Sequence, residues 1–196
     1  MLCFYLSHPQ VAIDPDTPVP QWHLSDRGRT RLETLAGKRW IAGLRRIVSS
    51  DETKAIETAI AVGALTGLPH DVLPDLHEND RSSTGFIEPD AFETAADAFF
   101  ANPEESHRGW ERAADAQQRI VAAVTAIARN GEAPVLFCGH GGVGTLLKCH
   151  LKGVAISRNE DQPGGGGNVY AFDPLAPRCL GDWTPLETFE WPANAP

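Results

Sequence analysis

Residues 135–142 read Val-Leu-Phe-Cys-Gly-His-Gly-Gly, a short apolar run that ends at a histidine in a glycine-rich turn. A continuous apolar run of this length is typical of a strand that is covered on both faces. After the turn, Val143, Leu146 and Leu147 stand at helical spacing, which predicts a helix. The strand–turn–helix unit indicates an α/β protein and places His140 at the carboxyl end of a strand.

The N-terminus has the same organisation. Residues 2–7 are predicted to form a buried strand, and His8 follows it directly. In open α/β sheets, ligands bind at the edge formed by the carboxyl ends of the strands. We therefore expect the imidazoles of His8 and His140 to meet at that edge, where one can attack a substrate while the other holds charge.

Further elements alternate along the chain. Strands are expected at 47–50 and 169–172, and Ser25 is expected to cap a helix that begins at Asp26. Ser49–Asp51 are expected to cap a second helix that ends at Gly67, and two more helices are expected over 89–100 and 110–129. This order predicts an α/β fold, a three-layer α/β/α sandwich with a mostly parallel central sheet. We expect the chain to form a single domain over 1–196, with a helical insertion or cap at about 79–130.

Composition narrows the class of protein. The 196 residues are 42% hydrophobic and 22% charged, which is ordinary for a globular domain. A net charge of −9 argues against a nucleic-acid partner, because phosphate backbones require clustered cations. No apolar run approaches membrane-spanning length, and the short N-terminal run lacks a basic leader. The cysteines show no CxxC spacing, so we expect free thiols and a cytoplasmic location.

The sequence contains a weak dinucleotide-binding pattern and no zinc-binding pattern. Residues 139–144 fit the GxGxxG pattern of dinucleotide-binding proteins. Their position late in the chain leaves no second βαβ unit, and Asp161 falls beside a glycine loop instead of at a strand end. No HxxxH or close Cys/His cluster indicates zinc. The sequence therefore predicts no metal and no cofactor.

Polar clusters occupy comparable strand-to-helix turns, and in order they resemble the histidine phosphatase superfamily, the phosphoglycerate-mutase-like proteins. The family's Arg-His-Gly/Pro motif corresponds to Ser7–Pro9, and its Leu-Ser/Thr-x-x-Gly motif to Leu24–Gly28. Its Ser-Ser-x-x-x-Arg-Ala-x-x-Thr-Ala turn corresponds to Ser49–Ala59. Its Leu-x-Glu motif corresponds to Leu76–Glu78, and its strand-His-Gly-Gly turn to His140–Gly142. The resemblance runs from about residue 2 to 173. Each motif alone is weak, and their order makes the resemblance specific.

The resemblance implies a metal-independent phosphomonoester hydrolase that acts on a small phosphorylated substrate. His8 would be the nucleophile that forms a phosphohistidine, Glu78 the proton donor to the leaving group, and His140 the residue that steadies the phosphoryl group. These residue types suit the chemistry, since a neutral imidazole is nucleophilic near neutral pH. A carboxylic acid can protonate the departing alkoxide.

Departures from the family pattern concern the phosphate pocket, for which we predict Ser7, Lys54 and Gly141, together with Arg81 because it lies three residues after Glu78. Ser7 stands where the family has its first arginine, and Lys54 fills the second arginine position. Loss of one oxyanion donor typically lowers the rate by about 10²–10³, and Arg81 is the residue expected to replace the charge.

Two functions remain open: a hydrolase with weakened activity, or a non-catalytic relative that binds a phosphorylated ligand or partner. The sequence leaves the oligomeric state open. Specificity is expected from the 79–110 region, whose aromatic residues are Phe86, Phe92, Phe99, Phe100 and Trp110.

Overall fold

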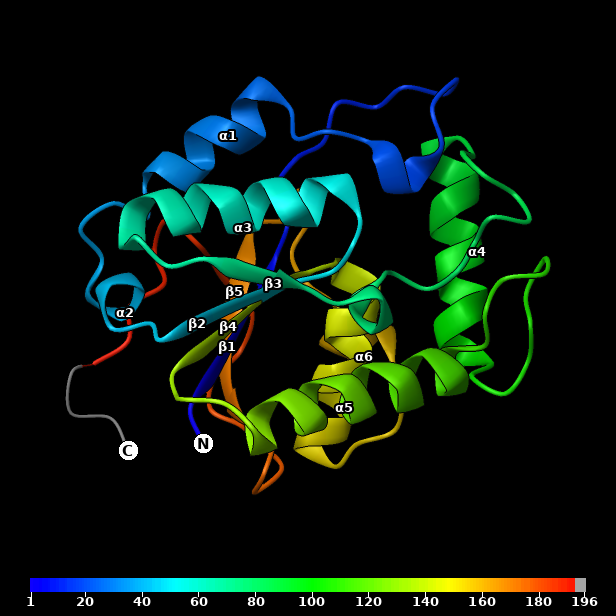
Figure 1. The fold of residues 1–196 in the computed structure, drawn as a ribbon. Helices are drawn as coiled ribbons and strands as arrows, with labels where there is room; N and C mark the ends of the chain where they lie inside the picture. The colour runs from blue at the N-terminus through cyan, green and yellow to red at the C-terminus, as the bar shows by residue number, and fades with distance from the viewer. Residues whose placement is uncertain (193–196) are drawn as a thin grey trace.

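The structure is a computed structural model that describes residues 1–192. One mixed sheet runs through its centre in the strand order β3-β2-β4-β1-β5-β6, with β7 paired to β5. Figure 1 labels strands β1 to β5. The parallel part contains β1 (Cys3–Ser7), β2 (Arg46–Ser49), β3 (His70–Val72) and β4 (Val135–Gly139). The antiparallel part contains β5 (Asn168–Asp173), β6 (Arg178–Cys179) and β7 (Thr184–Pro185).

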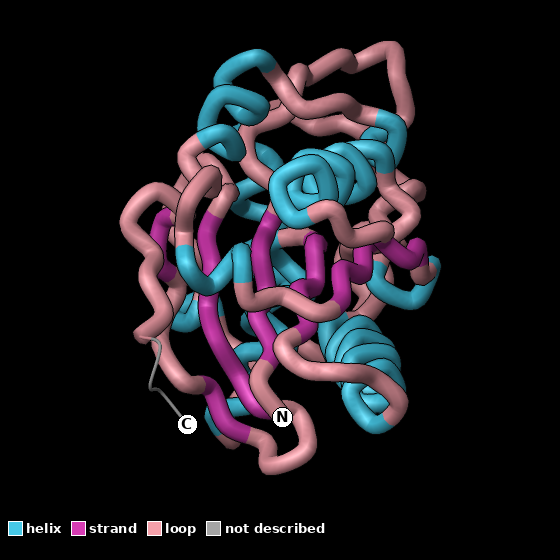
Figure 2. The backbone as a smooth tube through the Cα atoms, turned by 60° about the vertical axis from the view of Figure 1, so that its left-hand side comes forward, coloured by secondary structure: helices cyan, strands magenta, loops and turns pink. Residues whose placement is uncertain are grey.

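Helices cover both faces of the sheet, as Figure 2 shows from a second direction. One face carries α1 (Asp26–Glu33), α2 (Arg39–Ala42) and α3 (Thr53–Thr66). The other carries α5 (Ala113–Arg129) and α6 (Gly141–Lys152), and α4 (Pro89–Ala101) stands at the end of this layer (Figure 1). Short 3₁₀ turns occur at Val19–Gln21, Pro74–Leu76 and Arg158–Glu160.

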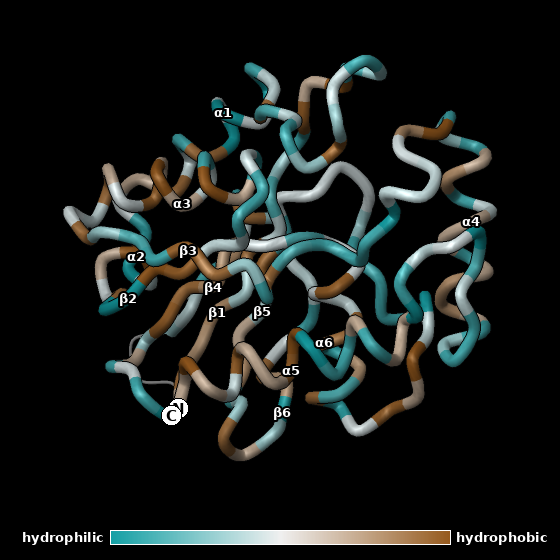
Figure 3. The backbone as a smooth tube through the Cα atoms, turned by 45° about the vertical axis from the view of Figure 1, so that its right-hand side comes forward, coloured by the Kyte–Doolittle hydropathy of each residue, from teal (hydrophilic) through white to brown (hydrophobic). Residues whose placement is uncertain are grey.

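Side chains of successive residues in the central strands point to opposite faces of the sheet, and this produces two separate hydrophobic cores. In β1, Phe4 and Leu6 pack with the helices of the α1–α3 layer, while Cys3 and Tyr5 pack with α5 and α6. Successive side chains of a strand point to opposite faces, so every central strand contributes to both layers. Figure 3 shows the resulting concentration of hydrophobic residues in the strands. The predicted α/β/α sandwich with a mostly parallel sheet is confirmed.

The register of β1 and β4 decides where the two histidines lie. Ser7, the last residue of β1, is paired with Gly139, the last residue of β4. His8 and His140 are the next residues of each chain segment, and the His8 N–H donates to the Gly139 carbonyl at 2.8 Å. Both imidazoles therefore leave the sheet at the same edge.

Of the two predicted helix caps, one is present in the structure. The Ser25 cap is confirmed, since its hydroxyl accepts from the Gly28 N–H at 3.1 Å. The predicted cap of α3 is wrong, because Glu52 holds the N-cap position and its side chain accepts no hydrogen bond from the first turn of the helix. Ser50 Oγ accepts the Glu52 N–H, which precedes the helix, at 3.2 Å. Within the 79–130 range, α5 packs on the sheet as part of the main core. The single-domain assignment with a helical insertion stays a prediction.

Among residues 1–192, no helix combines the length and apolar character that crossing a membrane requires.

Candidate active site

The two predicted histidines form the centre of the site. Their ring centroids lie 5.3 Å apart, with the ring planes at 70°. His8 Nδ1 lies 2.9 Å from the Pro9 carbonyl oxygen. Because a carbonyl oxygen only accepts, Nδ1 must carry the proton, and the lone pair of a neutral His8 then belongs to Nε2. Burial, together with the positive charge of Lys54, lowers the pKa of His8 to about 4. The ring is therefore neutral and nucleophilic near pH 7.

His140 is fully buried and held from two sides. Its backbone N–H donates to the Tyr5 hydroxyl at 3.0 Å, and Tyr5 donates to the His140 carbonyl at 3.1 Å. On the ring, Nε2 lies 2.6 Å from Ser50 Oγ and 3.6 Å from Glu52 Oε1. Nδ1 has no hydrogen-bond partner among the described residues. Burial holds the pKa of His140 well below its usual value, although the Glu52 carboxylate opposes this.

Glu52 is a component of the site that sequence reasoning missed. Its carboxylate is buried, pairs with the Lys54 ammonium group and accepts the Glu78 N–H at 2.9 Å. Despite burial, which opposes ionisation, His140 and Lys54 hold the pKa of this carboxyl well below its usual range. Glu52 thus joins the turn before α3, the Glu78 segment and His140 into one network.

Lys54 lies inside this network and lines neither cavity of the site. Its ammonium group donates to the Glu52 carboxylate and, at 2.9 Å, to the Val19 carbonyl. The sequence-based expectation that Lys54 contacts phosphate stays a prediction, and in this structure its charge is directed to Glu52.

Glu78, the predicted proton donor, sits at the N-terminus of α6. Its carboxylate oxygens accept from the Gly142 N–H at 3.0 Å and the Val143 N–H at 2.8 Å. Partial positive charge at a helix N-terminus favours a carboxylate there. Arg119 of α5 secures the segment that carries Glu78, since its guanidinium donates to the His77 carbonyl at 2.9 Å. No sequence motif pointed to Arg119.

The other predicted pocket residues separate into two groups. Arg81 lies with its guanidinium carbon 4.8 Å from the centre of the Phe92 ring, and no described carboxylate pairs with it. Arg81 and Gly141 both line a cavity with His8. Ser7 is fully buried and lines neither this cavity nor its neighbour.

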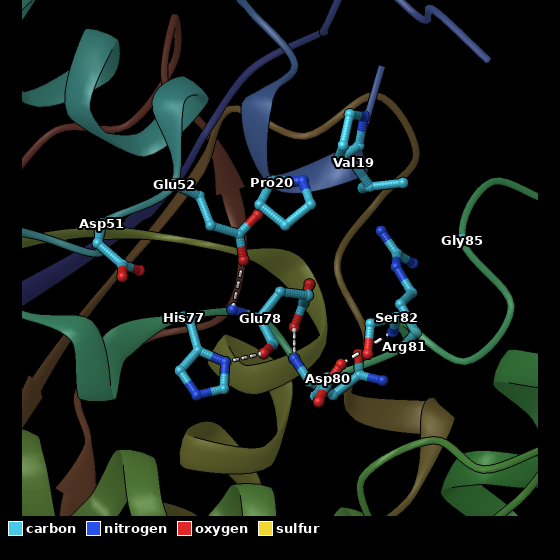
Figure 4. Close-up of a pocket in the computed structure, with 12 residues that line it drawn as sticks. Val19, Pro20, Asp51, Glu52, His77, Glu78, Asp80, Arg81, Ser82 and Gly85 are labelled. Atoms are coloured by element: carbon cyan, nitrogen blue, oxygen red, sulfur yellow. Dashed lines mark hydrogen bonds between the residues drawn. The ribbon is translucent and has the colours of Figure 1, made fainter. Parts of the chain in front are cut away.

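Two adjoining cavities define the space for a substrate. The one that contains His8 has a volume of about 310 Å³ and is lined by polar groups and by aromatic residues of the predicted specificity region, Phe92, Phe99, Phe100 and Trp110. The second has a volume of about 560 Å³, and Figure 4 shows its wall from Val19 and Pro20 across to Glu78, Asp80 and Arg81. Glu78, Asn79 and Arg81 belong to both linings. Phe86 packs against Trp22 instead.

Over residues 1–192, no three His, Cys, Asp or Glu side chains are grouped so that they could hold a metal ion. The described cysteines are all free thiols.

Solved structures with the same fold were found by comparison of coordinates. Mycobacterial glucosyl-3-phosphoglycerate phosphatase in complex with inorganic phosphate superposes with a TM-score of 0.78 at 20% identity, over 96% of this chain and 99% of that chain. Bacillus stearothermophilus YhfR gives a TM-score of 0.74 at 21% identity, over 97% and 98% of the two chains. A protein from Thermus thermophilus gives 0.65 at 20% identity, over 94% and 99%. Identities this low show a shared fold.

Sequence comparison supplies the family. None of the curated proteins matches this chain. The family model of the histidine phosphatase superfamily (branch 1) matches residues 14–191. That range includes Glu78 and His140, and it begins after His8, which the β1–β4 register brings to the same site. Because the match spans most of the chain, the protein belongs to the histidine phosphatase superfamily, branch 1.

Proposed function

We propose that the protein is a metal-independent phosphomonoester hydrolase that acts through a phosphohistidine formed on His8. The observation that carries the proposal is the pair of imidazoles 5.3 Å apart at one sheet edge, with His8 Nδ1 hydrogen-bonded to the Pro9 carbonyl. Because that hydrogen bond keeps the proton on Nδ1, Nε2 carries the lone pair that can attack phosphorus. The mycobacterial glucosyl-3-phosphoglycerate phosphatase, which shares this fold, was solved with inorganic phosphate and also with vanadate. This supports a phosphorylated substrate for the present protein.

In the first step, His8 Nε2 attacks the phosphorus atom, the N–P bond forms, and the bond between phosphorus and the ester oxygen breaks. Negative charge on the equatorial oxygens requires donors around them. Arg81 and the N-terminus of α6 at Gly141 line this space. His140 lies beside it, and Glu52 near its Nε2 favours the imidazolium form when a phosphoryl dianion arrives.

Glu78 is proposed to protonate the departing alkoxide, for which its carboxylate must first take up a proton from solvent, since the N-terminus of α6 favours the ionised form. Three carboxyl groups line the cavity with His8, and two of them, Glu93 and Asp161, are paired with Arg158 at 2.7 and 3.5 Å. Glu78 has no cationic partner among the described residues. In the second step, Glu78 takes a proton from water, the water oxygen attacks phosphorus, and the N–P bond breaks to release phosphate and regenerate His8.

The reaction is tested with His8→Ala on a panel of phosphate monoesters. We expect the wild-type protein to hydrolyse at least one ester, and His8→Ala to lose this activity while it keeps its thermal melting temperature. Rapid quenching of the wild-type reaction should trap a phosphoenzyme that is stable to base and labile to acid. A folded wild-type protein with no turnover on the whole panel would contradict the proposal.

A second function has its own structural support. The ammonium group of Lys54 is paired with the Glu52 carboxylate, and by the sequence resemblance Ser7 stands where the family has its first arginine. Both features leave fewer cations to face the phosphoryl group. A non-catalytic relative would bind phosphate or a phosphorylated partner with no turnover. Calorimetric titration with inorganic phosphate, together with the ester panel, separates the two functions.

A further inference from the structure

The hydroxyl of Ser7 forms hydrogen bonds with Gln162 and Asn168, which lie in the segment after α6. Ser7 Oγ donates to Gln162 Oε1 at 2.5 Å and accepts the Asn168 N–H at 3.0 Å. The side chain is fully buried and lines neither cavity. Ser7 therefore has no free hydrogen to offer a substrate, and its effect on the site must pass through Gln162.

Donor and acceptor matching fixes which way the Gln162 carboxamide faces. Asn168 Nδ2 lies 3.1 Å from the Pro163 carbonyl and 3.2 Å from the Gly166 carbonyl, and both of these groups only accept. The same nitrogen lies 3.1 Å from Gln162 Oε1. The Asn168 amide has two N–H bonds for these three acceptors, so Gln162 Oε1 shares one of them and also takes the Ser7 hydroxyl hydrogen. A nitrogen in that place would oppose the Asn168 donor, so Gln162 Nε2 must face away from it.

Gln162 Nε2 rests against the first residue of α6. A Cβ atom on Gly141 would collide with this nitrogen, so the amide occupies the space that glycine leaves. His8, Gly141 and Gln162 line the same cavity of about 310 Å³. Among the described residues, no group accepts a hydrogen bond from Gln162 Nε2.

An independent observation points to an anion in this cavity. Asn79 is 7% exposed and lines the cavity, and its Nδ2 finds no acceptor among residues 1–192. Buried donors are normally satisfied, and an unsatisfied one calls for an explanation such as an absent ligand. The Arg81 guanidinium lines the same space. A tetrahedral anion with several acceptor oxygens would satisfy these donors together.

We infer that Gln162 is a phosphoryl-binding residue whose Nε2 donates to an equatorial oxygen, and that Ser7 is a positioning residue that aims this amide. The inference rests on the proposed function, since it names a ligand of the phosphoryl group at that site. A neutral amide donor would then serve in this pocket where the sequence resemblance places a cation. The pocket would therefore hold the phosphoryl group with less positive charge, and the direction of each hydrogen bond would matter more.

The test measures binding of inorganic phosphate and vanadate by calorimetry, together with kcat/KM on a phosphate ester. Gln162→Glu puts an acceptor where Nε2 donates, and we expect phosphate affinity to fall about 10- to 100-fold. Gln118→Glu makes the same charge change on an exposed position of α5 outside the cavity. It should bind phosphate as the wild-type protein does.

The role of Ser7 is tested with Ser7→Ala and Ser7→Thr. Ser7→Ala removes the donor that holds Gln162 Oε1, so phosphate binding should weaken several-fold at a temperature where the variant is fully folded. Ser7→Thr keeps the hydroxyl and should restore phosphate affinity. A merely structural serine would change the melting temperature and leave the phosphate Kd of the folded protein unchanged.

The outcomes separate this inference from the proposed function. If Gln162→Glu and Ser7→Ala bind phosphate as the wild-type protein does, Gln162 is not a ligand, and hydrolysis by His8 is unaffected. If the wild-type protein binds phosphate without turnover, the hydrolase proposal fails, and the binding data still decide the role of Gln162. A wild-type protein that binds neither phosphate nor vanadate overturns both.

Discussion

Glu52 and Lys54 show how a buried ion pair can shape the site, since Glu52 lines the larger cavity and Lys54 lines neither. Both are buried, and each is the other's charge partner. Removing one member of a buried pair leaves the other charge uncompensated, at a cost of about 3–5 kcal/mol. We expect Glu52→Leu to lower the free energy of unfolding by this amount in urea denaturation.

The double variant Glu52→Leu/Lys54→Met is the matched control, because it removes both charges and keeps the apolar volume. It should recover most of the lost stability. Equal stability of the single and double variants would show that the ion pair is not the cause.

Ser7→Arg tests the position of Ser7 in the site. The new side chain must enter the space where Ser7 Oγ and the Gln162 amide are in contact. We expect Ser7→Arg alone to weaken phosphate binding, because it displaces the Gln162 amide. Adding Gln162→Gly should make room for the guanidinium and raise phosphate affinity above that of Ser7→Arg, as measured by calorimetry. A single Ser7→Arg variant more active than wild type would contradict the positioning role of Ser7.

At the residue scale the sequence placed His8 and His140 directly after strands, and the β1–β4 register brings them to one sheet edge. Glu78 follows a short 3₁₀ turn, and the catalytic roles of all three residues stay predictions. The sequence could not predict Glu52, Arg119 or Gln162, because their roles depend on partners distant in the chain. Glu52 meets the Glu78 N–H, and Gln162 meets Ser7 Oγ. Such contacts are set by the register of the sheet and by loop geometry, which no local pattern encodes.

Among the elements, α6 approaches β1 closely through a glycine. A Cβ atom on Gly144 would lie 2.5 Å from Tyr5 Cε1 and 3.0 Å from Trp183 Cη2. Overpacking of this kind costs about 1–3 kcal/mol, so Gly144→Ala should lower the melting temperature. Tyr5 also holds the His140 backbone, and we expect kcat/KM to fall as well.

Gly181→Ala provides the control, because a Cβ atom there meets nothing within 4 Å. It should leave both the melting temperature and the activity close to wild type. If Gly144→Ala melts as Gly181→Ala does, the close packing of α6 on Tyr5 is not a constraint.

Long apolar or amphipathic elements were predicted well, and short exposed ones were not. β4 and β5 are buried at every residue, and the sequence shows this as continuous apolar runs. β3 is an edge strand of three residues, His70–Val72, with two exposed residues, so it lacks an apolar pattern. β6 and β7 have two residues each and form only because β5 offers an edge.

For the whole molecule, the two imidazoles of the site, one fully buried and one partly buried, should make stability depend on pH. Burial lowers the pKa of His8 to about 4 and that of His140 well below its usual value, whereas the unfolded chain keeps values near 6.5. Below about pH 6.5 the unfolded state therefore binds more protons than the folded state, so the free energy of unfolding falls as pH decreases toward 4.

We expect the melting temperature to drop between pH 7 and pH 4.5, and His8→Asn to flatten part of that slope. A wild-type profile that is flat over this range would contradict burial of neutral imidazoles.

The shared wall of Glu78, Asn79 and Arg81 between the two cavities has a kinetic consequence. If the alcohol product departs through the 560 Å³ chamber while the phosphoryl group stays on His8, that chamber stands vacant during the second half of the cycle. A small added alcohol could then enter it and compete with water as acceptor. Phosphate ester synthesis would rise at the expense of free phosphate, and the partition ratio between the two acceptors would report the width of that exit.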